Sequence, residues 1–428
     1  NYGFEDAAQF YFGKSAKDLN ISEAATLAGI LPAPNRFNPI RDYDTAIEFR
    51  DRVINRMASQ GYISQEEAQR ARRSRIEINP KAKEELERTV APYFYYYVFD
   101  ELQELLGEQL AQEGNFIVET SLDLQIQRRA ETALVQAVEG TGANYGFSQG
   151  AIVTLNSQSG EILSLMGGTN FQKSQFNRAT QAQRQPGSTF KIFAYTAAFA
   201  KGLSPGSVFS CAPLTWEGQS FDGCGGGTLD VATAIARSDN AVSLRVAQEV
   251  GLDSVINTAR KMGIQSNLRS APGLILGQSE VNLLELTGAF GVLANRGVRN
   301  KPHAIKRILD SSDCTNPNDL KTCREIYNYA QSSEVNAAVL EPVVADLMTQ
   351  MLQGVTRSGT GRNAYLGLGE AGKTGTTNNN VDLWFVGYLP DRNLVTGVWL
   401  GNDDNSPTYG SSAQAAQLWG DYMGRVVR

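Results

Sequence analysis

The strongest constraint on the fold is the stretch from Arg184 to Phe199, where a Pro-Gly pair precedes a continuous apolar segment. Pro186 and Gly187 interrupt the preceding chain, and the Ala-rich run after them predicts a helix that begins at Ser188. The hydroxyl of Ser188 would then lie beside free backbone N–H groups and the positive end of the helix dipole. Lys191 follows one turn later and faces the same way, so a possible nucleophile is placed beside a possible base.

This Ser-x-x-Lys pattern has two interpretations. If the ammonium of Lys191 is partly desolvated against Phe190 and Phe193, its pKa falls toward neutrality, and the free amine can accept the hydroxyl proton of Ser188. In the other interpretation, the serine is an ordinary helix cap and the lysine is solvated. The rest of the chain has to decide between them.

The histidine content restricts the possible chemistry. His303 is the only histidine among 428 residues, and it lies in a Pro-containing turn that leads into a predicted strand. We expect it to be a turn or surface residue. A single histidine argues against Ser-His-Asp hydrolases and against His-rich metal sites.

The charge and hydropathy patterns exclude two further classes. A net charge of -6 leaves no basic stripe for a nucleic-acid backbone. No apolar run approaches the roughly 18–20 residues that span a membrane. Because the chain begins at Asn1 within a helical pattern, without a Met or a signal peptide, we expect it to be the C-terminal part of a longer protein whose anchor lies upstream.

Four cysteines form two close pairs, Cys211 with Cys224 and Cys314 with Cys323, in loops rich in Gly or Asn. Neither spacing fits a metal site. Two local disulfides in an oxidising compartment are the favoured interpretation, and free thiols are the alternative.

Apolar periodicity predicts an α+β fold. Residues 1–75 have helical patterns, with Ser22 and Ser64 as expected caps, and a charged run from Lys81 to Arg88 is expected to be a linker. An aromatic run then continues into a helix that ends near Gly107. Helices dominate residues 188–294, whereas strands are predicted at 116–121, 150–155, 161–166, 373–377, 382–388 and 394–400. We therefore expect one antiparallel sheet, assembled from both ends of this region, beside a helical lobe.

Two motifs match in letters and fail in context. Gly146-Phe-Ser-Gln-Gly150 has the spacing of a nucleophile elbow but precedes a strand, whereas an elbow leads from a strand into a helix. Gly367 to Thr374 fits a phosphate-binding loop, which requires a strand before it and a helix after it. Neither pattern is present, so no nucleotide site is predicted.

Two other motifs fit the Ser-Lys interpretation. Lys373-Thr374-Gly375-Thr376 begins a predicted strand whose backbone could bind an extended substrate, and the glycine would allow a close approach. The side chains of this strand could hold a carboxylate. Ser238-Asp-Asn240 lies between two helical patterns, where the serine could relay a proton and Asn240 could orient both substrate and Lys191.

Together, Ser188-Thr-Phe-Lys191, Ser238-Asp-Asn240 and Lys373-Thr-Gly-Thr376 resemble the three motifs of penicillin-binding proteins and serine β-lactamases. The segments near Ala7 and Ser22 resemble the C-terminal end of the peptidoglycan glycosyltransferase domain in class A bifunctional penicillin-binding proteins. Leu276-Gly-Gln-Ser-Glu-Val281 and Gly359-Thr-Gly361 resemble the transpeptidase domain of the same family. The resemblance covers nearly the whole chain.

The resemblance implies three regions and a fold. Residues 1–80 would be the end of a glycosyltransferase domain, residues 81–125 a linker region, and residues 126–428 a penicillin-binding transpeptidase domain with an antiparallel sheet and a helical lobe. The family's glycosyltransferase glutamates belong to motifs upstream of Asn1, so that activity is not expected from this chain.

The resemblance also implies a reaction, a D,D-transpeptidation that cross-links peptidoglycan stem peptides and is blocked by β-lactams. Ser188, deprotonated by Lys191, would attack the D-Ala-D-Ala carbonyl, and Ser238 would carry a proton to the departing D-alanine. The backbone N–H groups of Ser188 and Thr376 would form the oxyanion hole. Asn240 and the Lys373-Thr374-Gly375-Thr376 strand would bind substrate. No metal or organic cofactor is implied. The reaction would be extracytoplasmic, and the full-length parent would be membrane-anchored.

Three alternatives stay open at this point. A serine β-lactamase shares the motifs, but the Glu-x-x-x-Asn loop that class A β-lactamases use for deacylation is missing between Asn240 and Lys373. A D,D-carboxypeptidase would use water as the acceptor. A β-lactam sensor would be acylated without turning over any peptide.

Overall fold

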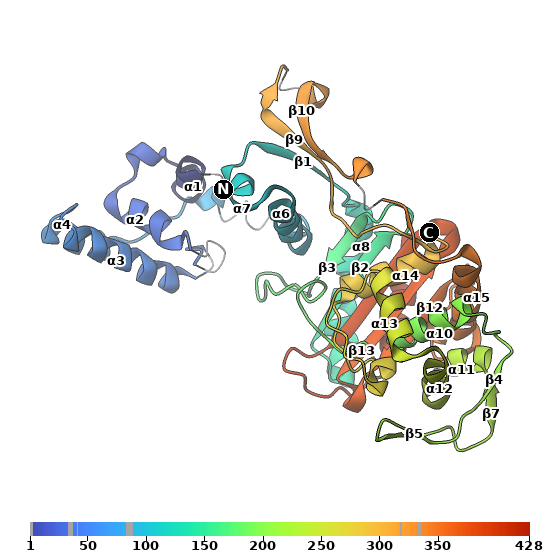
Figure 1. Cartoon of the computed structure of the whole chain (residues 1–428). Coiled ribbons are helices and arrows are strands. Elements are labelled where there is room, and N and C mark those ends of the chain that lie inside the picture. Colours follow the sequence, from blue (N-terminus) through green and yellow to red (C-terminus); the bar gives the residue numbers. More distant parts are fainter. Residues whose placement is uncertain (1–2, 33–36, 41, 83–88, 317–318, 333–334) are drawn as a thin grey trace. The chain divides into compact units, whose positions relative to one another are not determined.

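The chain consists of two units in a computed structural model that describes residues 3–32, 37–40, 42–82, 89–316, 319–332 and 335–428. The first unit takes its described residues from Asn1–Tyr95, Phe99–Ile117 and Asp310–Arg324. The second comprises Tyr96–Val98, Val118–Leu309 and Glu325–Arg428. Figure 1 colours the chain from blue at its start to red at its end, and the second unit contains most of the green-to-red part.

The first unit is mainly helical, as the sequence predicts. Ser64 caps its helix as expected, but the capping box of the second helix uses Asn20 with Glu23, so the expectation of a cap at Ser22 is wrong. Residues 83–88 of the expected charged linker lie outside the described residues. The helices are α1 (Gly3–Phe12), α2 (Ile21–Ile30), α3 (Tyr43–Ser59), α4 (Gln65–Arg73), most of α6 (Pro92–Leu106) and α7 (Glu108–Glu113).

The second unit is built on a five-stranded antiparallel sheet whose strands come from both ends of the region, as predicted. In spatial order they are β12 (Ala371–Thr376), β13 (Asp382–Leu389), β14 (Leu394–Gly401), β2 (Gln149–Asn156) and β3 (Ile162–Met166). All residues of β13 are buried, since helices cover both faces of the sheet. The register places Lys373 opposite Val386 and Gly375 opposite Trp384.

Two helical layers cover the sheet. On one side, α14 (Leu283–Ala294) packs against β2, β13 and β14, and a helical lobe adjoins it (Figure 1). On the other side, α8 (Leu124–Val135) and α16 (Ser412–Val426) share an apolar core with the strands. The lobe consists of α10 (Lys191–Ala200), α11 (Val231–Arg237), α12 (Asn240–Val250), α13 (Leu252–Lys261) and α15 (Pro342–Ser358). The sequence patterns did not predict α16.

Several smaller elements accompany these layers in the described residues. They are the short helix α9 (Gly142–Tyr145), the paired strands β4 (Val208–Ser210) with β7 (Thr228–Asp230), β5 (Leu214–Trp216) with β6 (Gln219–Phe221) and β8 (Val298–Arg299) with β11 (Ala337–Ala338), and a sheet of β1 (Phe116–Thr120), β9 (Ile305–Cys314) and β10 (Cys323–Asn328). As predicted, Gly146–Gly150 and Gly367–Thr374 both lead into strands, so neither is an elbow or a phosphate loop.

Both predicted disulfides are present, Cys211–Cys224 and Cys314–Cys323. The second pair does not lie in a loop as expected, because Cys314 ends β9 and Cys323 begins β10. The expectation of a surface position for His303 is also wrong. The residue is 3% exposed, its ring stacks on that of Tyr329, and burial lowers the pKa of the imidazole.

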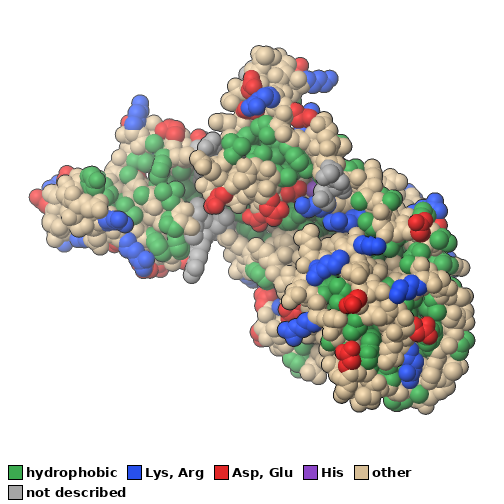
Figure 2. Space-filling model, in the orientation of Figure 1, with side chains coloured by type: hydrophobic (Ala, Val, Ile, Leu, Met, Phe, Trp, Pro, Cys, Tyr) green, Lys and Arg blue, Asp and Glu red, His purple; other side chains and the backbone are tan. Residues whose placement is uncertain are grey.

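The visible surface fits the modest negative charge of the chain. Figure 2 shows basic and acidic side chains interspersed over the second unit, with no extended basic stripe on the face it displays. Among the described helices, none combines the length and the apolarity that a membrane crossing requires.

Candidate active site

The nucleophile candidate lies in a helical turn, as predicted. Gly187–Phe190 form a 3₁₀ helix that continues directly into α10 at Lys191. Ser188 is partly exposed, whereas Thr189 and Phe190 are buried. The partly exposed serine therefore lies one turn before the buried lysine.

Lys191 is fully buried, and its amine is directed toward the Ser238–Asn240 loop. Its Nζ donates to the carbonyl of Ser238 at 2.7 Å, to the Ser238 hydroxyl at 3.3 Å and to Asn240 Oδ1 at 2.5 Å. Burial lowers the pKa of Lys191 to about 7, although the charge of Asp239 opposes this shift. The predicted desolvation of the lysine is confirmed. In the described part of the chain, Ser188 is not among the partners of this amine.

The Ser238–Asn240 loop joins α11 to α12 and is shaped by local interactions. Ser238 ends α11 in the left-handed region, with φ 58° and ψ 39°. The Asp239 carboxylate then caps α12 by accepting from the N–H of Val242 at 2.8 Å. This tight reversal turns both Ser238 oxygens toward Lys191.

Lys373 approaches the same hydroxyl from β12. It is 1% exposed, and its Nζ donates to Ser238 Oγ at 2.8 Å and to the Thr374 carbonyl at 3.1 Å. Burial lowers the pKa of Lys373, and the neighbouring Lys191 lowers it further. A serine hydroxyl can accept two hydrogen bonds and donate one, so Ser238 can link the two amines and still donate a proton.

The two threonines of β12 have different surroundings. Thr374 is buried, and its hydroxyl lies 2.6 Å from that of Thr360, in the Gly359-Thr-Gly361 segment. Thr376 is partly exposed, and its Oγ1 accepts from the N–H of Ser412 at 3.2 Å. Thr360 and Ser412 were not predicted as site residues.

Glycines bring the nucleophile turn against β12. A Cβ added at Gly375 would lie 2.3 Å from the Pro186 carbonyl oxygen, and one added at Gly187, whose φ is +55°, would lie 2.7 Å from the Thr376 carbonyl oxygen. The space beside Gly375 is therefore occupied by the chain itself, whereas the sequence interpretation reserved it for substrate. This contact places the backbone of Ser188 next to that of Thr376.

A second set of contacts fastens the chain just before the nucleophile to β13. The Trp384 indole donates to the Gln185 carbonyl at 2.8 Å. The Arg184 guanidinium lies 3.7 Å from Asp382 Oδ1 and stacks over Trp399, whose indole donates to the same carboxylate at 2.9 Å. We call Arg184, Gln185, Asp382, Trp384 and Trp399 the clamp. Sequence reasoning missed it.

The described structure thus brings together all eight predicted site residues. Lys191, Lys373, Thr374 and Gly375 are buried, while Ser188, Ser238, Asn240 and Thr376 are at least partly exposed. Such an arrangement can present a hydroxyl nucleophile over two amines of lowered pKa. Within the described ranges, no cluster of three Asp, Glu, His or Cys side chains could hold a metal ion.

Comparison with known proteins identifies relatives of both parts of the chain. Residues 150–424 match the model of the penicillin binding protein transpeptidase domain, and residues 1–58 match the transglycosylase model. Penicillin-binding protein 2D of Bacillus subtilis is 33% identical over 447 residues, which cover 99% of this chain and 61% of that protein. The chain thus spans about three fifths of the length of that relative.

Solved structures agree with this similarity. Penicillin-binding protein 1A from Haemophilus influenzae superposes with a TM-score of 0.68 at 23% identity, covering 100% of this chain and 83% of that chain, which supports the fold alone. The Mycobacterium tuberculosis PonA1 protein in complex with penicillin V gives a TM-score of 0.68 at 25% identity, covering 79% of this chain and 93% of that chain.

Proposed function

The chain belongs to the penicillin-binding protein transpeptidase family, with a transglycosylase fragment at its start as in class A members, and we propose that it is a serine D,D-transpeptidase. Its substrate would be a peptidoglycan stem peptide that ends in D-Ala-D-Ala. The observation that carries the proposal is the convergence of Lys191 and Lys373 on the hydroxyl of Ser238, with Lys191 one turn after the partly exposed Ser188. The structure of the PonA1 protein in complex with penicillin V supports the proposal that this chain binds β-lactams.

The first half of the reaction would acylate Ser188. The neutral amine of Lys191 takes the hydroxyl proton, and Ser188 Oγ forms an ester with the carbonyl carbon between the two D-alanines. The backbone N–H groups of Ser188 and Thr376 stabilise the oxyanion, each contributing roughly 3 kcal/mol. The C–N bond then breaks, and Ser238 gives its proton to the departing D-alanine while it regains one from an adjacent lysine.

The second half would transfer the acyl group. An amine of a neighbouring stem peptide attacks the ester, loses its proton through the same groups and releases Ser188. Lys373, Thr374 and Thr376 are proposed to hold the donor's terminal carboxylate, which would raise the pKa of Lys373 when bound. Asn240 would orient the peptide, and Thr374 would fix the strand through Thr360. A β-lactam would form the same ester and stall.

The surrounding assignments are also proposals. Residues 1–80 are assigned to the end of the glycosyltransferase domain, 81–125 to a linker region and 126–428 to the transpeptidase domain. An extracytoplasmic site of action agrees with the two disulfides, which persist in oxidising compartments. Membrane anchoring of the full-length parent stays a prediction.

Product analysis tests the proposed function. The protein is incubated with a donor stem peptide, with and without an amine acceptor, and the products are separated by mass. A transpeptidase gives cross-linked peptide only when the acceptor is present. Hydrolysis of the donor peptide to the same products with and without the acceptor would indicate a carboxypeptidase. Rapid hydrolysis of penicillin would indicate a β-lactamase. Acylation by penicillin without any turnover of peptide would indicate a sensor.

The rate of acylation should depend on pH through Lys191. Because burial lowers the pKa of this amine to about 7, the base is protonated and inactive at lower pH. We expect the first-order acylation rate constant with penicillin to rise as the pH increases through 7 and then to level off. A rate constant that does not change as the pH crosses 7 would contradict the assignment of the base.

The clamp should affect the rate of acylation more than binding. Asp382→Asn keeps the shape and an acceptor for Trp399 but removes the charge opposite Arg184, so the oxyanion donors lose their fixed position. We expect the acylation rate constant to fall about tenfold, with little change in the dissociation constant of the non-covalent complex. Both constants come from acylation rates measured over a range of penicillin concentrations.

A matched control is available in the same unit. Glu119→Gln removes the carboxylate that binds Arg307 at 2.8 Å, away from the clamp. This variant should acylate at the wild-type rate, even if its melting temperature falls slightly. Equal acylation rate constants for Asp382→Asn and the wild type would show that the clamp does not affect acylation.

A further inference from the structure

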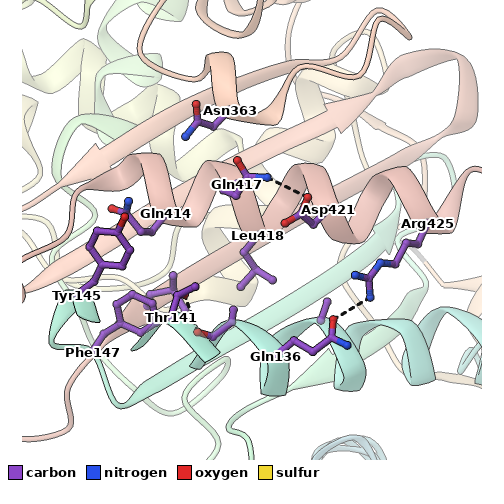
Figure 3. A pocket seen from close by; sticks show the side chains of 13 residues that line it. Gln136, Thr141, Tyr145, Phe147, Asn363, Gln414, Gln417, Leu418, Asp421 and Arg425 are labelled. Atoms are coloured by element: carbon purple, nitrogen blue, oxygen red, sulfur yellow. Dashed lines mark hydrogen bonds between the residues drawn. The ribbon is translucent and has the colours of Figure 1, made fainter. Parts of the chain in front are cut away.

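A groove outside the candidate active site lies along α16 (Figure 3). Its volume is about 310 Å³, at the lower end of the range for small-molecule sites. One wall is α16, and the other is the end of α8 with the π-helical turn Gln136–Thr141 and α9. None of its lining residues is among the proposed site residues.

The floor of the groove is apolar and one end is aromatic. Ala133, Leu418 and Phe147 are buried and line it, together with Leu400 from the sheet. The ring of Tyr145 stacks parallel to that of Phe147, with 6.5 Å between centroids, and remains exposed at the rim. This surface suits a small apolar or aromatic side chain.

The other end carries one acid and one base. Asp421 and Arg425 are four residues apart on α16, a spacing at which an acid and a base usually pair. Asp421 instead accepts from Gln417 at 2.9 Å, and Arg425 donates to Gln136 at 3.1 Å, as the dashed lines in Figure 3 show. In the described part of the chain, Asp421 and Arg425 do not form an ion pair with each other. Both charges therefore border the groove with hydrogen-bonding capacity left for a ligand.

The backbone of the opposite wall is irregular in the same place. The α-helical pattern of α8 changes to a π-helical turn at Gln136–Thr141, and Gln136, Ala137 and Thr141 of that turn line the groove. Single π-helical turns are rare and occur frequently at functional sites. Gln136, the first residue of this turn, accepts the hydrogen bond from Arg425 across the groove.

We propose that this groove binds a small zwitterion, namely a free α-amino acid with an apolar side chain. Its ammonium group would bind Asp421, its carboxylate would bind Arg425, and its side chain would lie over Leu418 toward Phe147. This binding does not depend on the proposed transpeptidase function.

A bound amino acid would also influence the candidate active site, and this second part rests on the proposed function. Gln414 lines the groove, and its Oε1 accepts from the N–H of Ser411 at 2.7 Å to cap α16. The next residue, Ser412, donates to Thr376. A ligand that engages Gln414 competes with this cap, so saturation should slow acylation by penicillin about fivefold.

Calorimetry with matched probes tests the binding. The probes are L- and D-phenylalanine, 3-phenylpropionate, which lacks the ammonium, and 2-phenylethylamine, which lacks the carboxylate. We expect one enantiomer of phenylalanine to bind about fivefold more tightly than either singly charged probe. No detectable binding of either enantiomer, or equal affinities for all probes, would overturn the proposal.

Charge variants show where the probes bind. Asp421→Asn should weaken the binding of phenylalanine and 2-phenylethylamine but not that of 3-phenylpropionate. Arg425→Gln should weaken the binding of phenylalanine and 3-phenylpropionate but not that of 2-phenylethylamine. Both side chains are exposed, so the fold should persist. Glu139→Gln, an exposed change on the π-helical turn that does not line the groove, should alter nothing. If both charge variants bind phenylalanine with the same affinity as the wild type, phenylalanine binds elsewhere.

Acylation measured with and without saturating phenylalanine separates the two parts of the inference. Slower acylation in the wild type, absent in Asp421→Asn, supports the link through Gln414. Binding with an unchanged acylation rate would overturn that link alone. If penicillin acylates neither the wild type nor the variants, the proposed function is wrong. The calorimetric data still show whether the groove binds an amino acid.

Discussion

Ser188→Ala is expected to lose essentially all peptide transfer, a fall of at least about 10,000-fold in turnover. The methyl group cannot form the acyl ester, and water is a poor substitute in a site arranged around the serine oxygen. Because the side chain is partly exposed at the start of a helical turn, its removal leaves no large buried cavity. The melting temperature and the non-covalent affinity for the donor peptide should therefore be close to those of the wild type.

Product formation, thermal unfolding and equilibrium dialysis of a labelled donor peptide provide these three values. A folded Ser188→Ala protein with turnover within about tenfold of the wild type would exclude this serine as the nucleophile. Loss of activity together with loss of folding would be tested again with Ser188→Cys, which keeps a nucleophilic atom and should retain slow acylation.

The second large effect is expected at Lys191. Lys191→Met keeps the length and the apolar stem of the side chain but removes the base, so the acylation rate constant should fall about 1,000-fold. The rise of the rate with pH should also disappear, because the titrating amine is gone. The variant no longer buries an amine, which favours its folding, but Asn240 and Ser238 lose their hydrogen-bond partner, which disfavours it. The two effects on the free energy of unfolding therefore oppose each other.

Lys201, at the C-terminal end of the same helix, provides the matched control. Its Nζ donates to the Val250 carbonyl at 2.7 Å and to Ser254 Oγ at 2.8 Å, away from the motif residues. Lys201→Met should leave both the acylation rate and its pH profile unchanged. A Lys191→Met protein that keeps the wild-type pH profile would mean that another group activates Ser188.

The local sequence was sufficient to predict the turn that carries Ser188, the strands of the sheet and the two disulfides. Pro186 and Gly187 predicted the helical turn at Ser188, and the apolar runs near Gly150 and Asp382 predicted strands that indeed belong to one sheet. That the three motifs form one site was implied by their resemblance to those of penicillin-binding proteins and serine β-lactamases. The two disulfides could be paired because each links cysteines that are close in sequence.

Long-range contacts explain what the sequence did not predict. Arg184 and Asp382 of the clamp are far apart in sequence, and nothing local to either shows that they meet. The left-handed backbone of Ser238 depends on its packing, since few non-glycine residues adopt that region unaided. His303 is buried by Tyr329, a partner on a distant segment.

One missed element did carry a signal. The helix α16 begins with a capping box of Ser411 and Gln414, which could have predicted its start. Two glycines in its second half, Gly420 and Gly424, obscure the helical pattern. Gly420 has a packing reason, since an added Cβ would lie 2.8 Å from the Asn363 carbonyl oxygen.

The most direct test of the central claim is to locate the acyl group. The wild-type protein is incubated with a labelled penicillin, its intact mass is measured, and the labelled peptide is mapped, with Ser188→Ala as the control. We predict one stable adduct on the peptide that contains Ser188 and none in the control. A folded wild-type protein without an adduct, or an adduct on another residue, would contradict the assignment of Ser188 as the nucleophile and return it to the role of a helix cap.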